Sequence, residues 1–188
     1  MLDFDNQEFE KQDYTISALE GREYADCTFN DCNFSNCDLS GKDFMDCLFE
    51  NCNLSNTKFK DTGLKSVKFN NCKLIGIDFS LCKAFLFSVS FNRGQLDYVV
   101  FDKMNLKKTL FNDCMIREAS FIETNLTQAG FINCNLLRTT FINSNLSETD
   151  FRTAFNYSFN PDNNLVKRAK FSYPAVLGLL DRFDIEVT

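Results

Sequence analysis

The sequence has no histidine and no tryptophan, and only two prolines and seven glycines among its 188 residues. Without histidine, the chain lacks the side chain that most often acts as a general base near neutral pH and as a metal ligand. No Ser-His-Asp or Cys-His arrangement can form, and neither G-x-G-x-x-G nor G-x-x-x-x-G-K occurs. We therefore expect a protein that is not an enzyme, with no catalytic residue, metal site, cofactor or small-molecule substrate.

Long hydrophobic runs are also absent. No stretch of 18 apolar residues occurs, which argues against a membrane span. The first ten residues, MLDFDNQEFE, are acidic and contain no apolar core of a signal peptide. We expect a cytoplasmic protein without membrane contact.

Basic residues are scarce over the first third of the chain. Residues 1–59 contain 13 acidic and four basic residues, net −9; residues 60–110 contain four and nine, net +5; residues 111–188 contain nine and seven, net −2. The total of −6 argues against direct binding of nucleic acid through its phosphates. The uneven distribution indicates either a charge gradient along the molecule or chance clustering on a solvated surface.

A large apolar residue recurs at every fifth position. This period fits neither an α-helix nor a flat strand, and it indicates a solenoid built from short repeats. Sixteen of the 22 phenylalanines share the register. We call each such position the centre, i. The centres are Phe4, Phe9, Tyr14, Leu19, Tyr24, Phe29, Phe34, Leu39, Phe44, Phe49, Leu54, Phe59, Leu64, Phe69, Leu74 and Phe79, and then every fifth residue from Phe91 to Phe151.

The position two residues before a centre is usually small, as in Cys27, Thr124 and Ala129, and the remaining positions are mostly polar. Segments such as CNFSN, CNLSN, TNLTQ and CNLLR resemble the pentapeptide-repeat family, over about four fifths of the chain. The resemblance implies an all-β fold, a right-handed quadrilateral parallel β-helix with four repeats in each coil. Residue n then stacks on residue n+20, the centre and i−2 side chains point inward, and stability comes from stacking of coils.

Alternation of Phe and Leu at the centres predicts that Phe occupies two opposite sides of the coil. The register shifts once, across SLCKAFLFSVSF. We expect a bulge, kink or small loop near residues 84–90, which absorbs two extra or three missing residues. We assign residues 1–156 to the β-helix and residues 157–188 to a C-terminal cap and dimerisation segment.

The cysteines share one position of the repeat. No C-x-x-C motif occurs, and side chains stacked in parallel have poor geometry for a disulfide. We interpret them as free, buried, small hydrophobic residues, with a metal or redox role as the alternative. All nine occupy i−2: Cys27, Cys32, Cys37, Cys47, Cys52, Cys72, Cys82, Cys114 and Cys134.

Arg22 and Lys42 depart from the pattern, because they occupy i−2 positions where a small residue is usual. We expect their stems to follow the corner and their charged groups to reach carboxylates on the same side. This arrangement either neutralises a stack of acids or leaves a negative docking surface. The acids are Asp3, Asp5, Glu23, Asp26, Asp43 and Asp46.

The ending FSYPAVLGLLDRFDIEV resembles the final segment of Qnr-type pentapeptide-repeat proteins. Apolar residues at helical spacing after Pro174 predict a short C-terminal helix. A solenoid also needs a cover over its open end, so the segment is interpreted as a cap as well. In the Qnr-type group it joins two protomers, which implies a homodimer interface at Val176, Leu177, Leu179, Leu180, Arg182, Phe183, Ile185 and Val187.

The Qnr-type resemblance also implies a partner. Such proteins bind DNA gyrase or topoisomerase IV, which they protect from quinolones or inhibit, as negatively charged mimics of DNA. We expect a non-catalytic, DNA-mimicking binder of type II topoisomerase, and the alternative is a structural scaffold with another protein partner. A continuous negative stripe would favour mimicry, and a neutral or basic waist would favour the scaffold. The candidate acidic partner surface is Asp26, Asp31, Asp43, Asp46 and Glu50.

Overall fold

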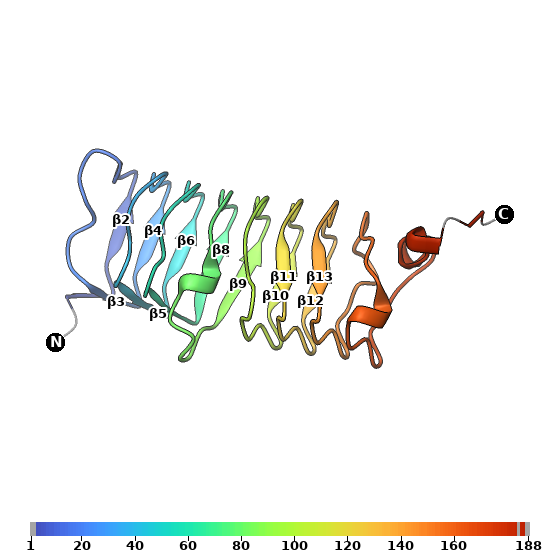
Figure 1. The fold of residues 1–188 in the computed structure, drawn as a ribbon. Coiled ribbons are helices and arrows are strands. Elements are labelled where there is room, and N and C mark those ends of the chain that lie inside the picture. The colour runs from blue at the N-terminus through green and yellow to red at the C-terminus, as the bar shows by residue number, and fades with distance from the viewer. Residues whose placement is uncertain (1–2, 184, 187–188) are drawn as a thin grey trace.

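The computed structural model describes residues 3–183 and 185–186. The chain winds into a rod of stacked coils, with the earliest strands at one end and the C-terminal segment at the other (Figure 1). All strand pairs are parallel, and residues twenty apart face each other, as in Phe9 with Phe29 and Phe29 with Phe49. The predicted β-solenoid and its four-repeat coil are confirmed.

Each coil has four sides, which we number in chain order. Side 1 contains the sheet β1 (Phe4–Asp5), β3 (Glu23–Ala25), β5 (Asp43–Met45) and β7 (Gly63–Lys65). Side 3 is paired through single bridges that run from Asp13 to Phe155, and side 4 contains β11 (Ser120–Ile122) and β13 (Thr140–Ile142). Side 2 is a seven-stranded sheet of β2 (Glu8–Glu10), β4 (Thr28–Asn30), β6 (Leu48–Glu50), β8 (Val67–Asn70), β9 (Val89–Asn92), β10 (Leu110–Asn112) and β12 (Gly130–Ile132).

The corners of the coil require a backbone that most residues avoid. Residues at i+2 have positive φ angles, for example 50° at Asp26, 54° at Asn51 and 53° at Asn133. Asn and Asp tolerate this left-handed region better than most residues, because their short side chains can hydrogen-bond locally. The polar i+2 positions of the repeat are therefore selected by the turn as well as by solvent.

The core is a set of aromatic and aliphatic columns. Within a column the rings stack nearly parallel, as in Phe111 with Phe131 at 4.8 Å and 5°. Rings of sides 2 and 4 meet edge to face, as in Phe121 with Phe131 at 5.9 Å and 89°. The expected two opposite Phe columns hold from Phe59 onward, whereas the first coils place aromatic rings on sides 1, 2 and 3: Phe4, Tyr24, Phe44; Phe9, Phe29, Phe49; Tyr14, Phe34.

The register shift lies in a loop on side 1. Before it, partners are twenty residues apart; across it, Val67 pairs with Val89 and Phe69 with Phe91, twenty-two apart. The loop follows the 3₁₀ helix η1 (Phe79–Leu81) and projects from the rod (Figure 1). Two extra residues are therefore accommodated in this loop, and the twenty-residue step returns at Gln95 and Met115.

The coil continues beyond residue 156, where the sequence register fades. Asn145 pairs with Leu165 and Asp150 with Lys170, again twenty apart. The ring of Phe171 stacks on Phe151 at 5.4 Å and 2°. The interruption is local, because Asn156 and Pro161 occupy the next two centre positions. The inward rings there are instead Tyr157 and Phe159, next to η2 (Pro161–Asn163).

The expected short C-terminal helix is present, but its hydrogen bonds are those of a 3₁₀ helix and not of an α-helix. The segment forms two 3₁₀ helices, η3 (Ala175–Leu179) and η4 (Asp181–Phe183). The bonds span three residues, from Leu177 N to the Pro174 carbonyl and from Leu180 N to the Leu177 carbonyl. Gly178 disfavours a regular helix, and its close contact with the last coil fixes the path of the segment.

All nine cysteines are free thiols, as predicted. Eight are buried and Cys37 is half-buried. Burial raises the pKa of both Cys47 and Cys82 to about 12, so these thiols are protonated at neutral pH. Each of the two therefore has the character of a structural residue.

Candidate functional site

The outer surface is the part of this molecule available for recognition, since the interior is filled with side chains. Among the described residues, no group of three His, Cys, Asp or Glu side chains is placed to hold a metal ion. Within the same residues, no helix has the length and apolar character needed to cross a membrane. Three surface features remain: the acidic residues of the first coils, the side 1 loop and the C-terminal end.

The five predicted acidic residues lie on two neighbouring sides. Asp26 and Asp46 are exposed at the corner between sides 1 and 2, in adjacent coils. Asp31 follows on the next corner, and its N–H donates to the Glu50 carbonyl at 3.0 Å. Asp43 is different, because it lies on side 1 and forms an ion pair with a lysine. The structure thus gathers four of the five around side 2.

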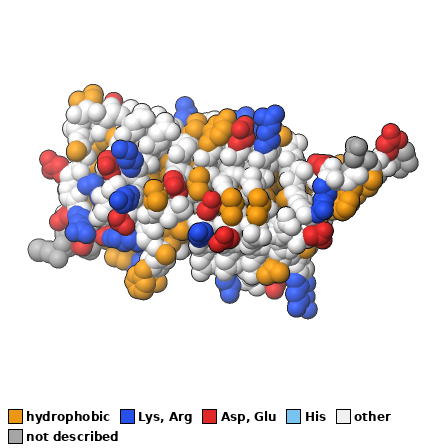
Figure 2. All heavy atoms as spheres, viewed as in Figure 1, with side chains coloured by type: hydrophobic (Ala, Val, Ile, Leu, Met, Phe, Trp, Pro, Cys, Tyr) orange, Lys and Arg blue, Asp and Glu red, His pale blue; other side chains and the backbone are white. Residues whose placement is uncertain are grey.

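The charge pattern is mixed on the face that Figure 2 displays. Acidic and basic side chains alternate there over the N-terminal half, and neither sign forms a continuous stripe. On this face the surface does not have the uniform negative charge of a duplex.

Among the described residues, neither Arg22 nor Lys42 forms an ion pair with a carboxylate, which corrects the expectation for these two residues. Arg22 Nε donates to the Gly41 carbonyl at 3.1 Å, and Lys42 Nζ donates to the Leu19 carbonyl at 2.9 Å and to the Gly21 carbonyl. Corner carbonyls lie nearer to an i−2 side chain than the outward carboxylates do. Asp3 instead accepts from two backbone N–H groups, of Arg22 and Glu23.

Asp43 forms an ion pair that the sequence did not indicate. Its Oδ1 lies 2.5 Å from Lys83 Nζ, although forty residues, or two coils, separate them. Between them lies Gly63, where a Cβ would come within 2.2 Å of Asp43 Oδ1. The missing side chain of Gly63 allows the bridge, and the pair fastens the base of the side 1 loop to β5.

A second ion pair is largely buried on side 3. Asp97 is 3% exposed and receives the Arg117 backbone N–H and Nε, both at 3.0 Å, and Nη2 at 2.5 Å. Gln95 Nε2 donates to the same carboxylate at 3.2 Å. Burial on its own raises the pKa of Asp97, but the Arg117 hydrogen bonds outweigh it and hold the pKa below its usual value. The sequence signal for this pair was the twenty-residue spacing between Asp97 and Arg117, which places them in adjacent coils.

The C-terminal segment covers the last coil incompletely. A Cβ on Gly178 would lie 2.0 Å from the Tyr157 carbonyl oxygen, so η3 contacts the coil there directly. A cleft of about 990 Å³ remains beside it, lined in part by Leu137, Ile142 and Phe155, which are 44%, 39% and 44% exposed.

The predicted interface residues occupy this end of the rod. Phe183 and Ile185 are 52% and 56% exposed, Arg182 is exposed with its guanidinium 4.9 Å from the Phe183 ring centre, and Val187 lies outside the described residues. The others are half-buried: Val176, Leu177, Leu179 and Leu180.

Comparisons with known proteins identify both the repeat and the overall fold. A family model described as the pentapeptide repeat region matches residues 22–101, 42–121 and 84–155. Two solved structures of trypsin-treated variants of QnrB1, a plasmid-mediated fluoroquinolone resistance protein, are each 20% identical to this chain, with TM-scores of 0.51 and 0.50. In both, the match covers 98% of this chain and 99% of the other. No curated protein matches the sequence.

Proposed function

Because this chain belongs to the pentapeptide-repeat family, we propose that it is a non-catalytic, cytoplasmic interaction protein that binds a type II topoisomerase, with DNA gyrase as the first candidate. Its effect would be a lower sensitivity of that enzyme to quinolones. The proposal uses the outer surface of the rod, since the filled core leaves the sides and the two ends as places where a partner can bind.

The observation that carries this proposal is the extent of the likeness to QnrB1. The two folds cover each other almost from end to end, including the C-terminal segment. QnrB1 is a fluoroquinolone resistance protein, and the likeness at 20% identity is one of fold. The resistance role is carried over on that basis, and the topoisomerase is the partner that the Qnr-type resemblance of the sequence implies.

The acidic residues around side 2 have the charge that suits contact with a DNA-binding enzyme. Asp26, Asp31 and Asp46 are exposed, and their charges sit on rigid corners of a packed coil. Fixed acidic groups attract a basic surface and accelerate encounter, most strongly at low salt. We assign the first contact with the topoisomerase to these residues and Glu50.

We also propose that the protein is a homodimer through its C-terminal end. Phe183 and Ile185 are more than half exposed, next to the apolar cleft at Leu137, Ile142 and Phe155. An apolar end of this kind is a common basis for a two-fold interface. Light scattering at micromolar concentration should report a dimer, and Phe183→Asp should shift it to a monomer. A clean wild-type monomer would remove this part of the proposal.

The topoisomerase proposal is tested by a supercoiling assay with purified gyrase. We expect the protein to change gyrase activity, or to raise the quinolone concentration needed for inhibition, at concentrations near that of the enzyme. The Asp26→Asn, Asp46→Asn double variant should act more weakly, with the difference shrinking at high salt. If the wild-type protein has no effect on activity or on drug sensitivity at stoichiometric excess, the topoisomerase is not its partner.

The mixed charge in Figure 2 favours a second candidate, a scaffold that binds another protein partner. A DNA mimic should be broadly negative, whereas residues 60–110 of this chain carry nine bases against four acids. In this case the rod acts as a rigid frame that presents one local site. Capture of gyrase by the immobilised protein separates the two candidates, because the scaffold would retain none.

A further inference from the structure

The loop on side 1 presents apolar side chains to solvent at the middle of the rod. Phe85 is 82% exposed and Leu86 is 53% exposed. Single exposed apolar residues are common, whereas these two are adjacent and lie at the tip of a projecting loop. Nothing in the packing of the core requires these two residues to be apolar.

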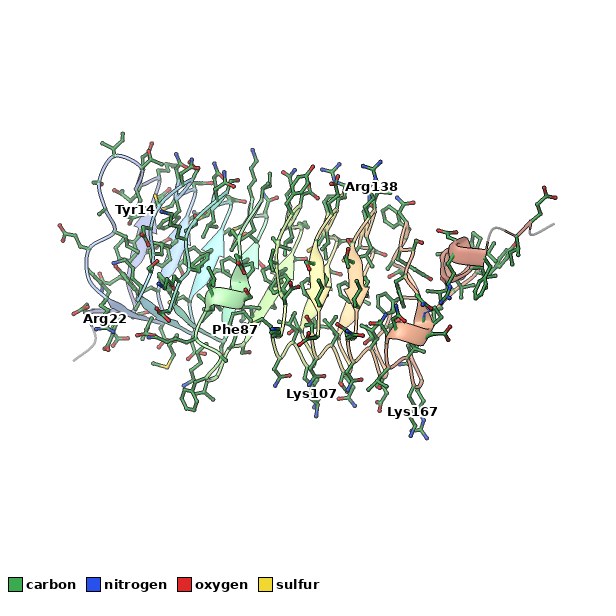
Figure 3. The ribbon with its side chains drawn as sticks, viewed as in Figure 1. Tyr14, Arg22, Phe87, Lys107, Arg138 and Lys167 are labelled. Atoms are coloured by element: carbon green, nitrogen blue, oxygen red, sulfur yellow. The ribbon has the colours of Figure 1, made fainter. Side chains whose placement is uncertain are left out.

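The loop is anchored on both sides of its tip. Lys83 N donates to the Thr62 carbonyl and Ser88 N donates to the Leu64 carbonyl, each at 2.9 Å. Phe87 turns back toward the core, and its ring lies 6.4 Å from that of Phe79 at 72°. In Figure 3 Phe87 marks the base of the loop as it leaves the rod. The tip is thus held outward in a fixed position, which lowers the entropy lost on binding.

Leu86 has a backbone conformation that its side chain does not favour. Its φ is +58°, and among the non-glycine residues with positive φ in the described chain it is the aliphatic one; most others are Asn, Asp or charged. A bulky residue in this region is unusual and is often associated with a functional site. An Asn at this corner would suit the fold better.

A shallow groove lies next to the loop. Its volume is about 390 Å³, and Met45, Gly63, Phe85 and Leu86 contribute to its lining. Gly63 has no side chain to fill the space between β5 and the loop, and the paired Asp43 and Lys83 also line the groove. The groove can take one large apolar side chain beside a rim that carries charge.

The surroundings of the groove on its N-terminal flank are acidic. The groove lining itself is balanced in charge, with Glu23 and Asp43 against Lys65 and Lys83. Asp26 and Asp46 are exposed on the adjoining corner, in adjacent coils. A partner residue with positive charge is therefore favoured at this corner, beside the groove.

From these observations we propose that the loop tip and the groove form a docking site for a partner-protein segment in which a large apolar side chain is flanked by Lys or Arg. The apolar residue enters the groove against Phe85 and Leu86, and the basic residues face Asp26 and Asp46. The inference rests on the proposed interaction function and names the surface used, but it does not require that the partner be a topoisomerase.

The test uses two short fluorescein-labelled peptides, one alternating Lys with Leu and one alternating Glu with Leu. Fluorescence anisotropy with the full-length protein should detect binding of the Lys-Leu peptide and not of the Glu-Leu peptide. The Phe85→Ser, Leu86→Ser variant should bind roughly tenfold more weakly, because apolar anchors carry most of such an interaction. Ile16→Ser is the matched control, since Ile16 is 86% exposed elsewhere on the rod.

Equal binding of the Lys-Leu peptide by the wild type and the double variant would overturn the proposal, as would tighter binding of the Glu-Leu peptide. Melting temperatures of the variants should match that of the wild type, which would show that a loss of binding is not caused by a loss of folding. If the wild type leaves gyrase unaffected but binds the Lys-Leu peptide through Phe85 and Leu86, the topoisomerase proposal fails and the docking site stands. If the wild type acts on gyrase but binds the Lys-Leu peptide no better than the Phe85→Ser, Leu86→Ser variant does, the docking site fails and the topoisomerase proposal stands.

Discussion

Position i−2 has a hydrogen-bonding role in addition to its small size. Its hydroxyl or thiol donates to the carbonyl of a centre residue in the preceding coil. Examples are Thr57 to Phe34 and Thr149 to Leu126, both at 2.8 Å, and Cys52 to Phe29 at 3.2 Å. This role explains why Cys and Thr are so frequent there, whereas the sequence alone indicated only small hydrophobic residues.

The loss of one such donor should be measurable. Thr124 Oγ1 donates to the Phe101 carbonyl at 2.9 Å in a fully buried setting. Thr124→Val keeps the shape but removes the donor, so we expect a loss of about 1 kcal/mol in unfolding free energy. Thr127→Val is the control, because Thr127 Oγ1 donates outside the core, to Asn125 Oδ1. Equal melting temperatures for Thr124→Val and the wild type would contradict the role of this donor.

The Asp97–Arg117 pair makes stability depend on pH. The depressed pKa of Asp97 means that its contribution is present above about pH 4, the usual Asp value, and is lost as pH falls through the lower folded-state pKa. Arg117→Ala leaves the ionised carboxylate buried without its partner. The expected loss is below the ~3–5 kcal/mol of a fully buried pair, because the Arg117 side chain is 41% exposed.

Thermal unfolding of Arg117→Ala from pH 3 to pH 7 tests this assignment. The deficit relative to the wild type should be largest near neutral pH and should shrink as the pH falls, because the Asp97 carboxyl of the variant, which lacks the guanidinium that lowers its pKa, is protonated before that of the wild type. Arg138→Ala is the matched control, since its contact with Glu118 is 3.7 Å long and exposed, and such pairs contribute about 0–1 kcal/mol. A deficit that is independent of pH would rule out Asp97 as its origin.

At the scale of elements, the five-residue period predicts the strands and columns, but not the ends. The last coil escapes the period because Asn156 and Pro161 occupy its centre positions, although Val166 and Phe171 return to the register. Burial of Tyr157 and Phe159 depends on the path of the chain around η2, and this path could not be predicted from the five-residue pattern. The candidate site shows the same limit, since the Asp43–Lys83 bridge requires a glycine in the coil between.

The C-terminal segment depends on one close contact. Gly178→Ala would place a methyl group where the Tyr157 carbonyl oxygen is 2.0 Å away, so η3 must move off the coil. We expect faster proteolysis of residues 172–183 and, if the dimer forms there, a shift toward monomer in light scattering. The exposed neighbour Ser158→Ala should leave both unchanged. An intact, protected segment in Gly178→Ala would show that this contact is dispensable.

At the scale of the whole molecule, the twenty-residue step makes each coil a removable unit. Deletion of residues 125–144 joins Thr124 to Asn145, which occupies the same place one coil later. The shortened protein should fold with a similar circular dichroism spectrum and a lower melting temperature, because stability sums over neighbouring coils. Deletion of residues 125–134 joins side 1 to side 3 and should prevent cooperative folding. Failure of both deletions to fold would indicate that the coils are not interchangeable.

A rod of nearly equal coils can align its chain in more than one way as it folds. A segment that stacks one turn too early still places apolar side chains over apolar side chains. The twenty-two-residue step between Phe69 and Phe91 removes this ambiguity. A coil that is shifted by one turn across this point would have to fit Phe85 and Leu86 into a corner of standard length. The same two residues would then favour one alignment of the chain over the shifted ones. Such an irregularity matters more in a repeat protein than in a protein without repeats, because the internal symmetry of the repeats is the main source of misfolded states with similar energy.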